Sequence, residues 1–240
     1  MTPMMRYSHD VSQKLVSFDG RQKHVAKAFD ALYEKLMVAD LNHKRVFSFF
    51  KKRVGANSNV RGIYLWGGVG RGKTYLMDLF YECLPFSEKQ RIHFHRFMLS
   101  IHEELECLQG VRNPLDRIAV RIAEKTKVLC VDEFFVMDIG DAMLLSGLLE
   151  GLFKRGVVFV ATSNAHPDSL YKDGLQRDSF LPAITLIKKY TDVIELSGAL
   201  DYRLRSLAKT VLYHSPHNED TEQHLYASFV ELVPYSGDIK

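Results

Sequence analysis

The segment that most constrains the fold is a glycine-rich loop at residues 67–74. It reads Gly67-Gly68-Val69-Gly70-Arg71-Gly72-Lys73-Thr74, which matches the GxxxxGKT pattern of a P-loop. An apolar run at residues 62–66 precedes the loop, and apolar residues at helical spacing follow it over 74–83. This motif needs a strand before it and a helix after it, so the context favours a true P-loop over a chance glycine-rich turn.

The same loop predicts a nucleotide site. Glycines let the backbone curl until several N–H groups face one centre, and the following helix adds its positive N-terminal end. Lys73 is long enough to reach the β- and γ-phosphates, and Thr74 can supply a hydroxyl to Mg²⁺. We therefore expect residues 67–74 to bind ATP together with Mg²⁺.

Length and composition agree with one large α/β domain. The chain has 240 residues, of which 46% are hydrophobic, and a net charge of +3, which is weak evidence for a polyanionic partner. The cysteines, Cys83, Cys107 and Cys130, are widely spaced, so we expect neither a disulfide framework nor a zinc site. The chain shows no secretory signal and no run of about 18 apolar residues. A cytoplasmic location is expected, with peripheral membrane contact left open.

Strands and helices alternate through the middle of the chain. The predicted strands cover residues 62–66, 91–97, 127–131, 157–163 and 192–196. The predicted helices cover 72–84, 98–109, 114–125, 139–155 and a stretch at 167–188 that is broken near Asp173 and Pro182. Such alternation predicts a five-stranded parallel sheet flanked by helices on both faces.

The part before the loop predicts an N-terminal helical segment. Residues 1–20 read as a polar lead-in, and residues 21–52 as two helices with a break near 40–42. The basic run Lys51-Lys52-Arg53 is interpreted as a solvated helix end, with a nucleic-acid patch as the alternative. We expect three parts: a helical segment at 1–58, a P-loop core at 59–212, and an incomplete C-terminal segment at 213–240.

Two acidic residues, Asp132 and Glu133, directly follow the apolar strand at 127–131. Because ligands bind at the carboxyl ends of parallel strands, these carboxylates should lie beside the P-loop. Asp132 is expected to hold Mg²⁺. Glu133 is expected to accept a proton from the attacking water or to orient that water, which favours hydrolysis over nucleotide binding alone.

Two further residues are candidates for catalysis. Asn164 follows the strand at 157–163 and could hold the water against the γ-phosphate, as a residue at this place does in AAA+ enzymes; an Asn that merely caps a turn is the alternative. Arg177 lies in the region that AAA+ enzymes place at the subunit edge. We expect it to act as an arginine finger in a neighbour's site, where such residues contribute about 10³–10⁵ in rate. A surface salt bridge is the alternative.

The pair His93 and His95 alternates with Arg91 along the predicted strand at 91–97. Two histidines on one strand face could bind a metal. No third ligand is evident in the sequence, so a structural role is expected.

Five segments together resemble the AFG-one-like ATPases, and the resemblance runs from about residue 2 to residue 212. They are the P-loop with its strand, Phe94-His95-Arg96-Phe97-Met98, Val131-Asp132-Glu133-Phe134, Ala161-Thr162-Ser163-Asn164 and Asp173-Gly174-Leu175-Gln176-Arg177. The resemblance implies an α/β P-loop ATPase of AAA+ type. Its bacterial members imply a divisome partner, FtsZ, at the division site, and its eukaryotic members imply the mitochondrial inner membrane. The lack of an Arg-rich leader favours the bacterial form.

The expected function is therefore Mg²⁺-dependent ATP hydrolysis that remodels or regulates a protein partner, in a homo-oligomer with shared active sites. The alternative is a nucleotide-gated adaptor, similar to helicase loaders, that binds single-stranded DNA in a salt-sensitive way. A small-molecule kinase would need an arginine-rich lid, which the sequence does not reveal. The resemblance also implies a longer C-terminal helical region than residues 213–240 supply.

Overall fold

The computed structural model describes residues 1–46 and 60–198. Residues 1–68 and 72–197 form one compact unit, to which the account below refers; residues 69–71 group separately with 198–240. The strands are β1 (Gly62–Trp66), β2 (Lys89–His93), β3 (Val128–Asp132), β4 (Val158–Ser163) and β5 (Thr191–Glu195). The α-helices are α1 (Pro3–Ser12), α2 (Gly20–Val46), α3 (Lys73–Cys83), α4 (Phe94–Cys107), α5 (Pro114–Lys125), α6 (Ile139–Lys154) and α7 (Leu181–Tyr190).

The strands form one parallel sheet in the order β2-β3-β4-β1-β5. Strands β3 and β4 are buried along their whole length, as continuous apolar runs in a parallel sheet require. Strand β4 lies between β1, which leads into the P-loop, and β3, which leads into Asp132 and Glu133. The predicted five-stranded parallel sheet is thus confirmed, and its order brings the candidate site residues to one edge.

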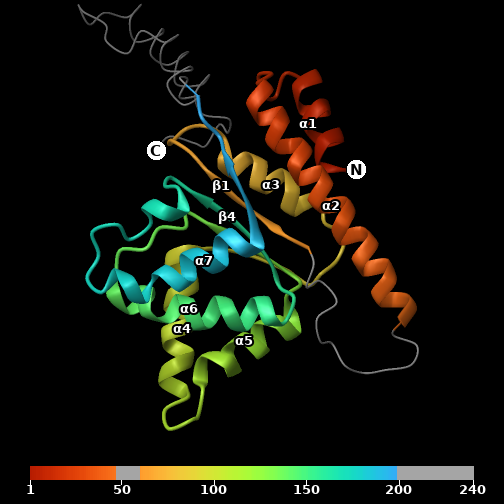
Figure 1. Cartoon of the computed structure of the whole chain (residues 1–240). Helices are drawn as coiled ribbons and strands as arrows, with labels where there is room; N and C mark the ends of the chain where they lie inside the picture. Colours follow the sequence, from red (N-terminus) through yellow and green to blue (C-terminus); the bar gives the residue numbers. More distant parts are fainter. Residues whose placement is uncertain (47–59, 199–240) are drawn as a thin grey trace, which may run out of the picture. The chain divides into compact units, whose positions relative to one another are not determined.

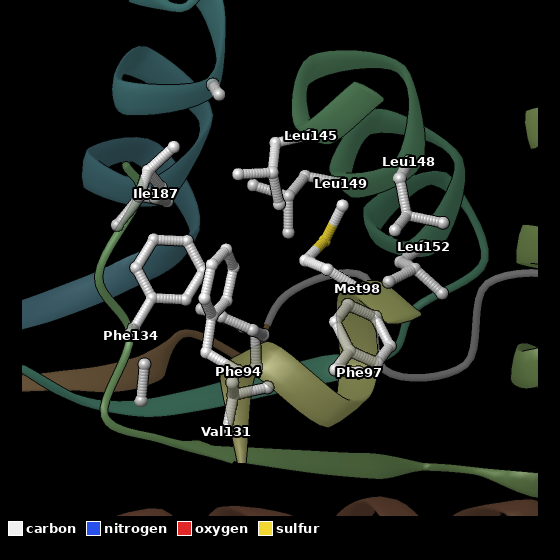
Figure 2. Close-up of a cluster of buried hydrophobic side chains, with 14 of the residues drawn as sticks. Phe94, Phe97, Met98, Val131, Phe134, Leu145, Leu148, Leu149, Leu152 and Ile187 are labelled. Carbon is white, nitrogen blue, oxygen red and sulfur yellow. The ribbon is translucent and has the colours of Figure 1, made fainter. Parts of the chain in front are cut away.

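Helices cover both faces of the sheet (Figure 1). One face packs against α1, α2 and α3, and the other against α4, α5, α6 and α7. The alternation of side chains along β3 assigns Val128 and Cys130 to the first core and Leu129 and Val131 to the second. Figure 2 shows the second core, where Phe94 and Met98 of α4 point toward Phe134 and the leucines of α6.

The N-terminal segment differs from the prediction in two ways. Residues 3–12 are not a polar lead-in but the helix α1, whose first turn is capped by the Thr2 hydroxyl and opened by Pro3. Helix α2 is continuous through residues 40–42, where a break was expected. The ring of Phe29 in α2 stacks on that of Phe80 in α3, with centroids 4.8 Å apart. The N-terminal helices therefore share a core with the sheet.

The stretch after β2 is also corrected. Strand β2 ends at His93, and residues 94–97 begin helix α4 rather than continue the strand. The reason is that the buried residues of α4 recur at helical spacing: Phe94, Phe97, Met98 and Ile101. His93 and His95 consequently do not share a strand face. Among the described residues, no group of three or more His, Cys, Asp or Glu side chains is placed to hold a metal ion.

The stretch at residues 167–188 contains two short 3-10 helices, Pro167–Ser169 and Arg177–Ser179, before α7. Pro182 does not break a helix but stands in the first turn of α7, where a missing N–H is harmless. Within residues 1–46 and 60–198, no helix combines the length and apolar character needed to cross a bilayer. The expected boundaries near 58 and 212 lie outside the described residues and stay predictions.

Candidate nucleotide site

The P-loop follows β1 and ends where α3 begins at Lys73. Glycine is required at Gly67 by a close approach to backbone and at Gly72 by a positive φ. A Cβ on Gly67, whose φ is 153°, would lie 2.3 Å from the carbonyl oxygen of Leu196. A Cβ on Gly72, whose φ is 88°, would lie 2.6 Å from Nε2 of Gln22. Gly72 also has no side chain to cap α3, so the first N–H groups of this helix suit an anion.

Lys73 and Asn164 meet at the edge of the sheet. The Lys73 ammonium donates to the carbonyl oxygens of Gly67 and Gly68, at 2.6 and 2.7 Å, and to Oδ1 of Asn164, at 2.9 Å. The structure therefore places the predicted phosphate-binding cation directly against the predicted γ-phosphate sensor. The two residues are 91 positions apart in the chain, and the pairing of β1 with β4 brings them together.

Asp132 is nearly inaccessible at the end of β3, with 2% of its surface exposed. Its Oδ1 accepts a hydrogen bond from the Thr162 hydroxyl at 3.2 Å, and its Oδ2 accepts one from Nε of Arg91 at 2.6 Å. Thr74 is exposed in the first turn of α3, a helix that contacts β3. Carboxylate and hydroxyl oxygens are ligands that suit Mg²⁺, so the chemistry of Asp132 and Thr74 fits the expected ion.

Glu133 adopts a left-handed backbone conformation, with φ of 54°, which is uncommon for a residue other than glycine. Its N–H donates to Oγ1 of Thr162 at 3.1 Å, and the next N–H, of Phe134, donates to the Thr162 carbonyl at 2.7 Å. The Glu133 side chain is 78% exposed. The end of β4 therefore holds the backbone of Glu133 and leaves its carboxylate facing solvent.

An open pocket of about 650 Å³ joins Glu133 with Asn164. Its other lining residues are His93, Phe94, His95, Arg96, Phe135, Met137, Asp138 and Asp141. The Glu133 carboxylate lies 3.9 Å from Nδ1 of His93. The candidate general base and the candidate sensor thus open onto one space that is large enough for water and phosphate.

Arg177 is not among the residues that line this pocket. Its Nη2 donates to the carbonyl oxygen of Asp168 at 2.7 Å, and its Nε is buried without a hydrogen-bond partner among the described residues. The neighbouring Asp168 carboxylate pairs with Lys188 rather than with Arg177. Within residues 1–46 and 60–198, Arg177 is held by the backbone carbonyl of Asp168 and forms no salt bridge.

Two residues of the site were missed in the sequence. Thr162 was noted only as part of a polar strand end, and Arg91 only as part of an alternating strand. The sequence signal for Thr162 is a hydroxyl two positions before Asn164. Arg91 offers no such signal, because its contacts with Asp78 and Asp132 depend on the pairing of β2 with β3.

The strand order, with a P-loop after β1 and an acidic pair after β3, defines a P-loop fold of the AAA+ type. The chain belongs to the AFG1-like ATPase family, whose model matches residues 1–238.

Similar proteins span bacteria and vertebrates. The chain is 47% identical over 242 residues to cell division protein ZapE of Escherichia coli (strain K12), covering 97% of this chain and 64% of that protein. It is 42% identical over 191 residues to lactation elevated protein 1 homolog B of Danio rerio, and the match covers 75% of this chain and 38% of that protein. The chain thus spans less than two thirds of the length of these relatives.

Solved structures with a similar fold include the crystal structure of DnaI, with a TM-score of 0.45, 20% identity and coverage of 66% of this chain and 79% of that one. AMPPCP-bound DnaA from Aquifex aeolicus has a TM-score of 0.47 and 14% identity, and the match covers 75% of this chain and 57% of that one.

Thr162→Val should destabilise the protein, because it keeps the shape of the side chain but leaves the N–H of Glu133 without its acceptor. We expect the free energy of unfolding to fall by about 1–3 kcal/mol, measured by chemical denaturation. The control is Thr185→Val, which removes an exposed hydroxyl from α7 and should change stability by less than about 0.5 kcal/mol. Equal effects of the two substitutions would contradict this role of Thr162.

Proposed function

We propose that this chain hydrolyses ATP with the help of Mg²⁺ and couples hydrolysis to a change in a protein partner. The observation that carries the proposal is the convergence at one sheet edge. Lys73 contacts Asn164, Asn164 shares a pocket with Glu133, and Thr162 links Glu133 to Asp132. Membership of an ATPase family supports the same conclusion.

The P-loop and Lys73 would bind the phosphates. The loop N–H groups and the N-terminus of α3 offer donors to the phosphate oxygens, and Lys73 would exchange the loop carbonyls for the β- and γ-phosphates. Thr74 and Asp132 would hold Mg²⁺, which when bound neutralises the developing charge on the phosphates. Asp132 is already oriented for this by the Thr162 hydroxyl.

Glu133 and Asn164 would prepare the attacking water. The Asn164 amide can orient that water near the γ-phosphate, and a carboxylate oxygen of Glu133 can accept its proton. The exposed Glu133 side chain has room to turn toward a water in the pocket, whereas its backbone stays anchored to Thr162.

Glu133→Gln is expected to bind ATP as the unaltered protein does but to lose turnover, because the amide cannot accept the proton. Phosphate release should fall by about 10²–10⁴-fold, with nucleotide affinity measured separately by fluorescence. Glu150→Gln, on the exposed face of α6, is the matched control and should keep full activity.

Normal turnover by Glu133→Gln would remove Glu133 as the general base. Tight ATP binding without hydrolysis by the unaltered chain would instead favour the nucleotide-gated switch. Phosphate release by Lys73→Ala provides the baseline, since this variant lacks the phosphate-binding cation.

We further propose that copies of this chain assemble and share active sites, with Arg177 acting in the neighbour. Arg177 has a buried Nε without a described partner and lies in a short, separate 3-10 helix, so its guanidinium could be released toward another subunit. Mixing Arg177→Ala with Lys73→Ala should then restore activity, because a mixed site can combine an intact Lys73 with an intact Arg177.

The measurement is phosphate release per subunit against protein concentration, for each variant and for their mixture. Each variant alone should be inactive, and the mixture should recover part of the unaltered rate. A mixture as inactive as its components would exclude Arg177 as a residue supplied in trans.

The proposed partner is FtsZ, at the division site of a bacterial cell. The support is the 47% identity to a relative whose name is cell division protein. In a sedimentation assay with purified FtsZ, the chain plus ATP should change the amount of polymer, and Glu133→Gln plus ATP should not. If the unaltered chain and Glu133→Gln changed the amount of FtsZ polymer equally, ATP hydrolysis would not be coupled to this partner.

A further inference from the structure

Arg91 on β2 connects two carboxylates that belong to different elements. Its Nε donates to Oδ2 of Asp132 at 2.6 Å, and its Nη1 contacts Oδ1 of Asp78 in α3. The Arg91 side chain is 23% exposed, against 3% for Asp132 and 44% for Asp78. The guanidinium suits this place because its planar set of donors can serve two acceptors in fixed directions.

The position of Asp78 in α3 shows which elements the Arg91 contacts connect. Asp78 follows Thr74 by four residues in α3, so the two side chains lie on one face of the helix, one turn apart. Arg91 therefore connects the helix that carries Thr74 to the strand end that carries Asp132. These are the two elements whose oxygens would have to meet around one ion.

The charges also suit a cation site. Arg91 compensates one of two carboxylates, so the trio of Arg91, Asp78 and Asp132 keeps a net negative charge. Thr162 holds the other oxygen of Asp132, which fixes the plane of the carboxylate. Groups that orient a metal ligand in this way raise metal affinity without touching the metal.

We propose that Arg91 is a positioning residue that sets the spacing between the Thr74 hydroxyl and the Asp132 carboxylate, and thereby the affinity of the nucleotide site for Mg²⁺. The inference rests on the proposed role of Thr74 and Asp132 at the metal. Without Arg91, the buried Asp132 would lose its cation and the polar link between Asp78 of α3 and Asp132 of β3 would be broken, so the two oxygens would no longer be held for one ion.

The test is binding of a fluorescent ATP analogue by the full chain, first in EDTA and then across a series of Mg²⁺ concentrations. Arg91→Gln should leave the Mg²⁺-free affinity unchanged. The Mg²⁺ concentration that gives half of the ion's effect on nucleotide affinity should rise by about 10-fold or more. Arg91→Lys keeps the charge but not the planar donors. Its Mg²⁺ requirement should lie between those of the unaltered chain and of Arg91→Gln.

Asp78→Asn tests the bridge without removing the cation beside Asp132. It should also raise the Mg²⁺ requirement, and it keeps the inference testable if Arg91→Gln fails to fold. The matched control is Arg155→Gln. Arg155 is 25% exposed and pairs with Asp116 between α5 and α6, so its loss should leave the Mg²⁺ dependence unchanged.

An unchanged Mg²⁺ requirement in both Arg91→Gln and Asp78→Asn would overturn the inference. So would a parallel loss of Mg²⁺-free and Mg²⁺-dependent binding, since that is the mark of general destabilisation. If the unaltered chain itself bound nucleotide without any effect of Mg²⁺, the proposed function would fail first. The Mg²⁺ response of the unaltered protein thus distinguishes a failure of the proposed function from a failure of the inference about Arg91.

Discussion

The hydroxyl of Thr162 is the contact on which the site depends. It donates to Asp132 and accepts from the N–H of Glu133, so one buried group fixes both members of the acidic pair. The carbonyl of the same residue holds Phe134, which anchors the chain as it leaves the sheet. Because Thr162 belongs to β4, between β1 and β3, this contact ties the acidic pair to the strand that ends beside Asn164.

The remainder of the fold keeps that edge in place. Burial of β3 and β4 by helices on both faces leaves their carboxyl ends little freedom to move. The N-terminal helices contribute directly, since Gln22 of α2 lies against Gly72 of the P-loop and Arg21 donates to the carbonyl of Ser197 after β5. The helical segment ahead of the P-loop is therefore part of the frame around the site.

Residue patterns predicted the sheet well because parallel strands are buried on both faces and read as short apolar runs. They did poorly near residues 93–97, where Arg91, His93 and His95 alternate like a strand, whereas the buried Phe94, Phe97 and Met98 follow helical spacing. They also missed α1, whose Met4, Tyr7 and Val11 pack in or against the core at helical spacing. At residues 93–97 two periods compete over a handful of residues, and packing against the core decides between them.

The sequence by itself determined the P-loop, the acidic pair after a buried strand and the polar end of the next strand, because each is a local pattern tied to one strand end. Only the tertiary structure decided which of these residues meet. Lys73 reaches Asn164, Thr162 joins Asp132 to Glu133, and Arg91 spans Asp78 and Asp132. The physical reason is that strand order and register, which place distant residues at one edge, come from packing of the whole sheet and not from any one segment.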